Sequence, residues 1–145
     1  MEQFNFDKFE EWLEYVEGST HRARKLCTAP RTGCCLGMGM LYLGAEYNDA
    51  DGLIYQGALY TTYPPYEALA QLVPREWMRN LGGAVWEEGG VGWDIALSNK
   101  AEELAKEMLN SSGSYLYISH VNDESKDFSV VLAVLRLMKE EYLNG

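Results

Sequence analysis

The feature that most constrains the fold is an apolar stripe near the C-terminus. Six apolar residues recur there with the spacing of one face of an α-helix. They are Phe128, Val131, Leu132, Leu135, Met138 and Tyr142. An apolar face of this length must be covered, so the sequence predicts a helix, capped by Ser125 or Asp127, that packs into a core.

Two other segments carry the same helical pattern. Their apolar residues are Phe6, Phe9, Trp12, Leu13 and Val16 in the first, and Ala101, Leu104, Ala105, Met108 and Leu109 in the second. Asn99 and Glu102 resemble a capping box with Asn as the cap. Shorter helices are expected over residues 67–73 and from Pro74 to Asn80.

Strand patterns are shorter and weaker. Residues 53–62 alternate loosely, residues 115–119 form a short strand pattern, and residues 84–86 and 91–95 flank a turn as in a hairpin. The glycine-containing run 33–44 fits a helix or a strand. No repeat or linker divides the chain. We therefore predict one compact α+β domain over residues 1–145, with a helix-dominated core and a small antiparallel sheet.

Composition and charge exclude several classes of protein. The 145 residues are 47% hydrophobic, with a net charge of −10. Hydrophobic content at this level supports a core, and no run of ~18 apolar residues predicts a membrane span. The acidic, amphipathic segment Met1–Glu17 is not typical of a secretion signal, so we expect a cytoplasmic protein. The negative charge disfavours non-specific duplex binding and favours a partner with a basic surface.

One stretch reverses this charge. Arg22, Arg24, Lys25 and Arg31 lie close together, with no acid between Glu17 and Glu46. Together they form a candidate anion site for a phosphate or carboxylate. Alternatively, these cations pair with the acidic first helix.

Cysteine chemistry has only weak support. Cys27, Cys34 and Cys35 lack the spacing of a structural zinc site, so we expect no metal and no cofactor. A thiol nucleophile needs a base and an orienting group, and Cys35, His120 and Asn122 are the candidate set. The sparseness of such groups favours a non-catalytic role.

Tyrosines are unusually dense, since six of the ten fall between residues 42 and 66. Tyrosine provides a stiff, amphipathic contact area, and aromatic faces also stack on nucleobases. Alternatively, these rings belong to a half-buried sheet. The candidate interface residues are Tyr47, Tyr55, Tyr60, Tyr63, Tyr66, Trp86 and Trp93.

Several short motifs, taken in order, resemble a group of small bacteriophage proteins without an assigned activity. An Arg-containing segment is followed by Cys34-Cys35-Leu36-Gly37, a Val73-Pro74 helix start, Asn122-Asp123 and Phe128. The resemblance covers most of the chain and implies a phage accessory protein, but no reaction. Within this pattern, Gly37 is expected to allow another element to approach closely.

Together these features predict a phage-encoded binding protein, without catalysis, that acts in the host cytoplasm. It would interfere with a host factor or defence system by stoichiometric capture of a host protein, and homo-oligomers are possible. One alternative is a sponge for a small, cyclic or linear, nucleotide signal that uses the basic and aromatic residues. Another is a Cys-dependent hydrolase or transferase.

Overall fold

Helices are the main secondary structure of this computed structural model, which describes residues 3–48, 52–81 and 92–145. Its helices are α1 (Asp7–Glu17), α2 (Cys35–Tyr42), α3 (Tyr66–Leu72), α4 (Asn99–Leu109), α5 (Ile118–Glu124) and α6 (Ser129–Asn144), with a 3₁₀ turn η1 at Arg75–Trp77. The strands are β1 (Thr20–His21), β2 (Thr32–Gly33), β3 (Glu46–Asn48), β4 (Gly52–Tyr55), β5 (Ala58–Tyr60), β6 (Met78–Asn80) and β7 (Trp93–Ile95). The predicted single α+β domain with small antiparallel sheets is confirmed.

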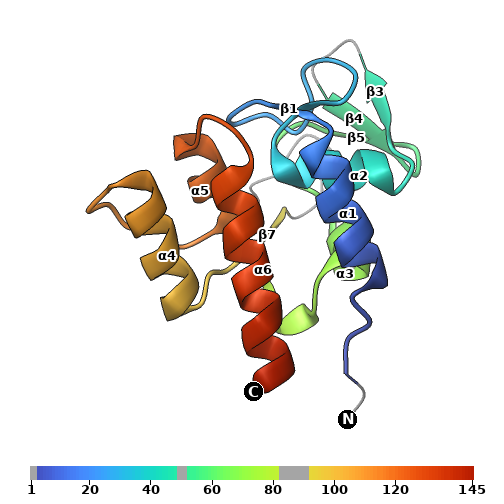
Figure 1. The fold of residues 1–145 in the computed structure, drawn as a ribbon. Coiled ribbons are helices and arrows are strands. Elements are labelled where there is room, and N and C mark those ends of the chain that lie inside the picture. Colours follow the sequence, from blue (N-terminus) through green and yellow to red (C-terminus); the bar gives the residue numbers. More distant parts are fainter. Residues whose placement is uncertain (1–2, 49–51, 82–91) are drawn as a thin grey trace.

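The long amphipathic helices lie where their apolar faces predict. Helix α6 packs against α4 and α5, while α1 packs against α2 and α3 (Figure 1). The apolar stripe of α6 is buried from Val131 to Met138. Two basic residues of α6 also form ion pairs with acidic residues of α1. Lys139 Nζ lies 2.6 Å from Glu10 Oε2, and Arg136 lies 2.6 Å from Glu17 Oε1. Within the described ranges, no helix has both the length and the apolar character needed to cross a membrane.

The glycine-containing run forms a helix. Cys34 is the N-cap of α2, and its Sγ accepts a hydrogen bond from the Gly37 N–H at 3.4 Å. A Cβ atom on Gly37 would lie 1.6 Å from the Leu26 carbonyl oxygen, which belongs to the backbone and cannot swing away. The expected close approach at Gly37 is therefore confirmed, because the absence of a side chain there lets the Leu26 backbone lie directly against α2.

The predicted strand over residues 53–62 is wrong, because the chain turns within it. Gln56 and Gly57 adopt positive φ angles of 49° and 84°. This tight turn separates β4 from β5, which pair antiparallel with Leu53 opposite Tyr60, and β3 completes the sheet beside β4.

Three other local predictions are corrected, two of them by hydrogen bonds to distant parts of the chain. The segment from Pro74 forms only the η1 turn, because residues 78–80 pair with residues 93–95 as β6 and β7. The strand expected at 115–119 is wrong, since Tyr117 makes one bridge to Ala96 and the chain then enters α5. Ser98, not Asn99, caps α4 through its Oγ, which accepts from Ala101 N at 3.2 Å. Residues 84–86 of the expected hairpin lie outside the described residues.

Candidate functional site

Asn122 is the polar junction of the structure. Its side chain is fully buried on α5. Its Nδ2 donates to the Arg22 carbonyl at 3.1 Å, and its Oδ1 accepts from the Cys35 N–H at 3.2 Å. Its own carbonyl lies 2.8 Å from the His21 ring nitrogen Nε2. One amide thus joins α5 to the loop after β1 and to the start of α2.

Two neighbouring contacts extend this junction. The Arg24 N–H donates to Asp123 Oδ1 at 2.8 Å, with Arg24 held at a φ of 70°. The His21 ring packs edge-on against Phe128, with 5.1 Å between ring centroids. The arginine segment, the Cys34–Gly37 motif, Asn122-Asp123 and Phe128 therefore meet in one region, although they are far apart in the sequence.

The candidate catalytic residues do not form a catalytic arrangement. Burial raises the pKa of Cys34 to about 12, and burial raises the pKa of Cys35 as well. Asn122 bonds the Cys35 backbone rather than its thiol. The His120 ring packs edge-on against Tyr117 at 5.3 Å, and no hydrogen bond joins it to a thiol within the described part of the chain.

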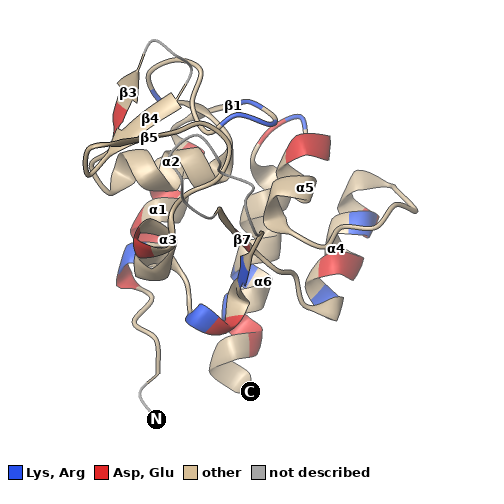
Figure 2. Ribbon diagram, turned by 180° about the vertical axis from the view of Figure 1, so that it is seen from behind, with Lys and Arg blue, Asp and Glu red and all other residues tan. Residues whose placement is uncertain are grey.

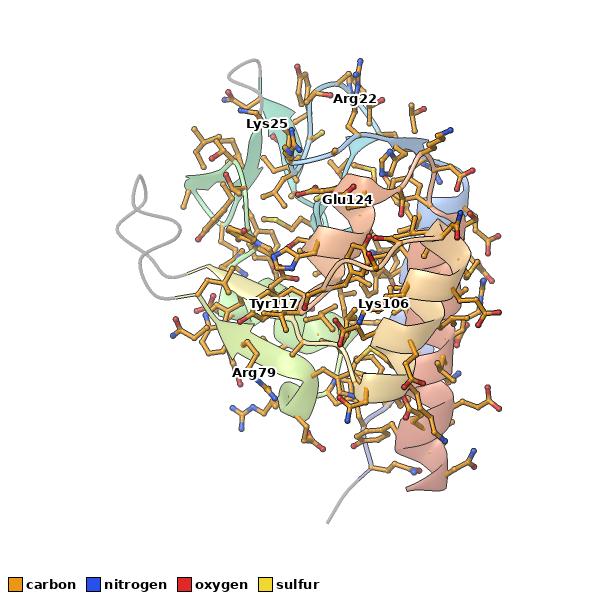
Figure 3. The ribbon with its side chains drawn as sticks, turned by 90° about the vertical axis from the view of Figure 1, so that its left-hand side faces the viewer. Arg22, Lys25, Arg79, Lys106, Tyr117 and Glu124 are labelled. Carbon is orange, nitrogen blue, oxygen red and sulfur yellow. The ribbon has the colours of Figure 1, made fainter. Side chains whose placement is uncertain are left out.

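Three of the four predicted cations share one loop, and the fourth does not. We call residues Arg22–Lys25 the basic loop. The Arg22, Arg24 and Lys25 side chains are exposed, and none forms an ion pair with another described residue. Figure 2 shows their basic charge beside the acidic end of α5, and Figure 3 places Arg22 and Lys25 at one end of the molecule.

Arg31 instead belongs to the end of α1. Its Nε donates to Ser19 Oγ at 3.1 Å, and its NH2 donates to the Tyr15 carbonyl at 3.1 Å. The guanidinium lies 4.1 Å from the centre of the Tyr15 ring. Arg31 thus contacts the first helix, which was the alternative to an anion site. The contact uses the Tyr15 ring and carbonyl rather than carboxylates.

A cavity of about 170 Å³ lies between the basic loop and α5. It is lined by Arg24, Cys34, Thr62, Tyr63, Ser119 and Asp123. The Tyr63 hydroxyl and Ser119 are hydrogen-bonded, and burial raises the pKa of Tyr63. The cavity therefore presents one guanidinium and several polar groups to a small ligand.

Asp94 lies behind this cavity and bonds its lining residue Ser119. It was not among the residues predicted from the sequence. It is fully buried on β7, where its Oδ1 accepts from the Ile95 N–H at 2.7 Å and its Oδ2 accepts from Ser119 Oγ. Burial raises its pKa from 3.8 to about 6. In the sequence, an aspartate between apolar residues of an expected strand could have indicated such a site, because a buried acid needs hydrogen-bond partners.

The predicted aromatic residues are partly used inside the protein. Tyr55 is buried and its hydroxyl accepts from Gln71 Nε2 at 3.0 Å, whereas the Tyr47 hydroxyl donates to the Thr28 carbonyl at 2.9 Å. Tyr66 and Trp93 pack edge-on at 5.0 Å. Tyr60 and Tyr63 are half-buried, and Trp86 lies outside the described residues. Each described member combines core packing with a limited exposed face.

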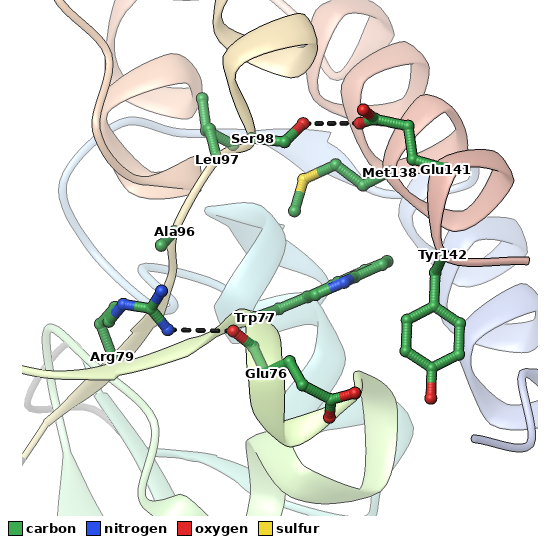
Figure 4. A pocket seen from close by; sticks show the side chains of 9 residues that line it. All are labelled: Glu76, Trp77, Arg79, Ala96, Leu97, Ser98, Met138, Glu141 and Tyr142. Atoms are coloured by element: carbon green, nitrogen blue, oxygen red, sulfur yellow. Dashed lines mark hydrogen bonds between the residues drawn. The ribbon is translucent and has the colours of Figure 1, made fainter. Parts of the chain in front are cut away.

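A second hollow, seen from close by in Figure 4, lies at the other end of the molecule, where Figure 3 places its lining residue Arg79. This hollow, the Trp77 groove, has a volume of about 340 Å³. It is lined by Glu76, Trp77, Arg79, Ala96, Leu97, Ser98, Met138, Glu141 and Tyr142. None of these residues was a candidate in the sequence analysis, because they come from three distant segments.

Neither metal ligation nor similarity to known proteins assigns a function. Across residues 3–48, 52–81 and 92–145, no group of three or more His, Cys, Asp and Glu is placed to hold a metal ion. No family model matches the chain, and no curated protein or solved structure matches it.

We predict that Asn122→Ala lowers the free energy of unfolding by about 2–4 kcal/mol, because the buried Cys35 N–H loses its partner. Urea unfolding measures this change. Asp123→Asn is the matched control, since its amide oxygen still accepts from Arg24 and its effect should stay below about 1 kcal/mol. A loss below 1 kcal/mol for Asn122→Ala would contradict the junction.

We also predict that Asp94 makes the protein more stable as the pH falls. Its pKa is higher in the folded state than in the unfolded chain, so folding favours the protonated form. The stability it confers below pH 4 is lost as the pH rises through about 6, by up to about 3 kcal/mol. Denaturation from pH 4 to 8 should show this slope in the native protein and not in Asp94→Asn.

Asp127→Asn provides a control of opposite sign. Hydrogen bonds from Ser129 lower the pKa of Asp127, so its stabilisation is lost as the pH falls. The same pH slope in native protein and Asp94→Asn would contradict the prediction for Asp94.

Proposed function

We propose that this protein is a phage-encoded, non-catalytic binding protein that captures a host factor, or part of a host defence system, in stoichiometric amount. The observation that carries the proposal is the use of Asn122. Its amide is occupied by the Arg22 carbonyl and the Cys35 N–H, both backbone groups. The most specific polar arrangement of the chain thus holds the fold together and is not available to a substrate.

The electrostatics of the thiols support the same proposal. With a pKa of about 12, only roughly one Cys34 thiol in 10⁵ is ionised at pH 7. The thiolate is the nucleophile, and reactive cysteines lie in electropositive, accessible surroundings. Cys35 is fully buried instead, so the Cys-dependent hydrolase or transferase is the least supported alternative.

Two regions of the surface offer groups suited to contact with a partner. The basic loop projects three cations, and the Trp77 groove combines aromatic and carboxylate groups. A net charge of −10 attracts a basic partner and speeds its association. We propose the host cytoplasm as the place where this capture occurs.

Capture is tested with the tagged protein in bacterial lysates. We expect one host protein to be recovered at close to one copy per copy of the bait, and recovery to fall at high salt because charges contribute. Iodoacetamide should modify the cysteines of the bait only after denaturation. Repeated failure to recover a partner near one-to-one, or rapid thiol modification of the folded bait, would contradict the proposal.

A nucleotide sponge is the second candidate, because the Arg24 guanidinium lines the cavity beside Tyr63 and forms no ion pair with another described residue. Arginine binds phosphate, and an aromatic ring can stack on a base. The volume of about 170 Å³ admits only part of a nucleotide, so most of the ligand would lie over the basic loop.

Calorimetry with cyclic and linear nucleotides tests this second candidate. If it is correct, Arg24→Ala should weaken binding at least about tenfold, because a charged contact to phosphate is lost. Lys100→Ala, an exposed cation on α4, is the matched control and should bind normally. Absence of heat with every nucleotide would remove the sponge.

A further inference from the structure

The Trp77 groove has an aromatic lining between two distant elements. Trp77 comes from η1 and Tyr142 from the end of α6, with ring centroids 6.3 Å apart and ring planes at 85°. Trp77 is 8% exposed, whereas Tyr142 is half-buried and presents more of its ring. Met138 completes the apolar surface. Because the two rings are held by different elements, they form an aromatic surface that is already in place before a ligand binds.

Two carboxylates flank these rings. The Glu76 side chain is exposed, and its carboxylate has no hydrogen bond or ion pair with another described residue. Glu141 Oε1 accepts from Ser98 Oγ at 2.6 Å, which fixes the side chain and leaves its second oxygen available. In Figure 4 the Glu141 carboxylate lies beside Ser98 on one side of the Trp77 ring, and the Glu76 carboxylate lies on the other side, toward Tyr142.

The cations near the groove do not neutralise these carboxylates. Arg79 lies across Trp77 from Tyr142 in Figure 4, and its NH1 donates to the carbonyls of Glu76 and Met78 at 3.0 and 2.8 Å. Arg75 donates to the Tyr66 hydroxyl instead. Lys139 pairs with Glu10 on α1. The lining of the groove thus contains two carboxylates and one guanidinium, and neither carboxylate forms an ion pair with another described residue.

We infer that the Trp77 groove receives an arginine side chain from a basic segment of a partner protein. A guanidinium is attracted to aromatic rings, and it forms charge-assisted hydrogen bonds with carboxylates. Glu76 and Glu141 supply the acceptors, and the half-buried Tyr142 ring supplies an aromatic contact. The inference rests on the proposed capture function and names the chemistry of the captured surface.

The dimensions and charge of the groove favour this occupant. A volume of about 340 Å³ lies at the lower end of small-ligand pockets, which suits one long side chain. A hollow lined by Gln3, Phe4, Pro74 and Arg75 adjoins it and shares Glu76, Glu141 and Tyr142. This adjoining surface can accommodate the backbone that follows the inserted residue.

The test uses the full-length protein and two capped peptides, Gly-Gly-Arg-Gly-Gly and the same sequence with citrulline in place of arginine. Citrulline keeps the shape of arginine without its charge. We expect the arginine peptide to shift the indole N–H resonance of Trp77 in a saturable manner. Binding of the citrulline peptide should be at least about fivefold weaker, because the charge-assisted contacts are absent.

Matched variants locate the site. Glu76→Gln and Glu141→Gln should each weaken the arginine peptide about threefold to tenfold, since the charge is lost while the amide oxygen still accepts from Ser98 in the second variant. Glu107→Gln, an exposed acid on α4, should leave binding unchanged. The amide spectrum of each variant shows that the fold is retained.

Equal binding of both peptides, no shift at Trp77, or preference for a capped Gly-Gly-Glu-Gly-Gly peptide would overturn the inference. These results are distinguishable from failure of the proposed function. If a host protein is captured one-to-one but the arginine peptide does not bind, the groove assignment is wrong and capture stands. If the peptide binds but no partner is recovered, the groove stands and capture is wrong.

Discussion

The fold depends on one buried amide, that of Asn122. From α5 it bonds the Arg22 carbonyl and the Cys35 N–H, which lie 100 and 87 residues earlier in the chain. A buried N–H without a partner costs free energy, so these segments must stay together for the structure to persist. Together with the Arg24–Asp123 contact, this amide ties the basic loop to α5, beside the small cavity near Arg24.

The side chains with reactive groups are buried in this protein and contribute to its packing. The thiols are buried and help to cap and pack α2, while Asp94 bonds Ser119 at the start of α5. The exposed cations of the basic loop and the Trp77 groove lie at different ends of the molecule. Figure 3 places Arg22 and Lys25 at one end and Arg79, beside the Trp77 groove, at the other.

The candidate site was only partly predictable. The Cys34–Gly37 motif, the arginine segment and Asn122 were all singled out, yet the contact that joins them uses backbone groups rather than the Cys35 thiol. Arg31 looked equivalent to Arg24 in the sequence, but its guanidinium stacks on Tyr15 instead. Asp94 and Trp77 were missed, because their partners lie on elements far away in the chain.

The sequence by itself determined the helices with an apolar face, since helical periodicity is local and burial follows from it. That holds for α1, α4 and α6, and it holds for the close approach at Gly37, where only hydrogen fits beside Leu26. Tertiary structure decided the rest. Residues 78–80 became a strand because residues 93–95 offered hydrogen bonds, and residues 118–124 became a helix whose first turn Asp94 bonds from β7. Short segments have nearly balanced local preferences, so contacts from distant residues set their conformation.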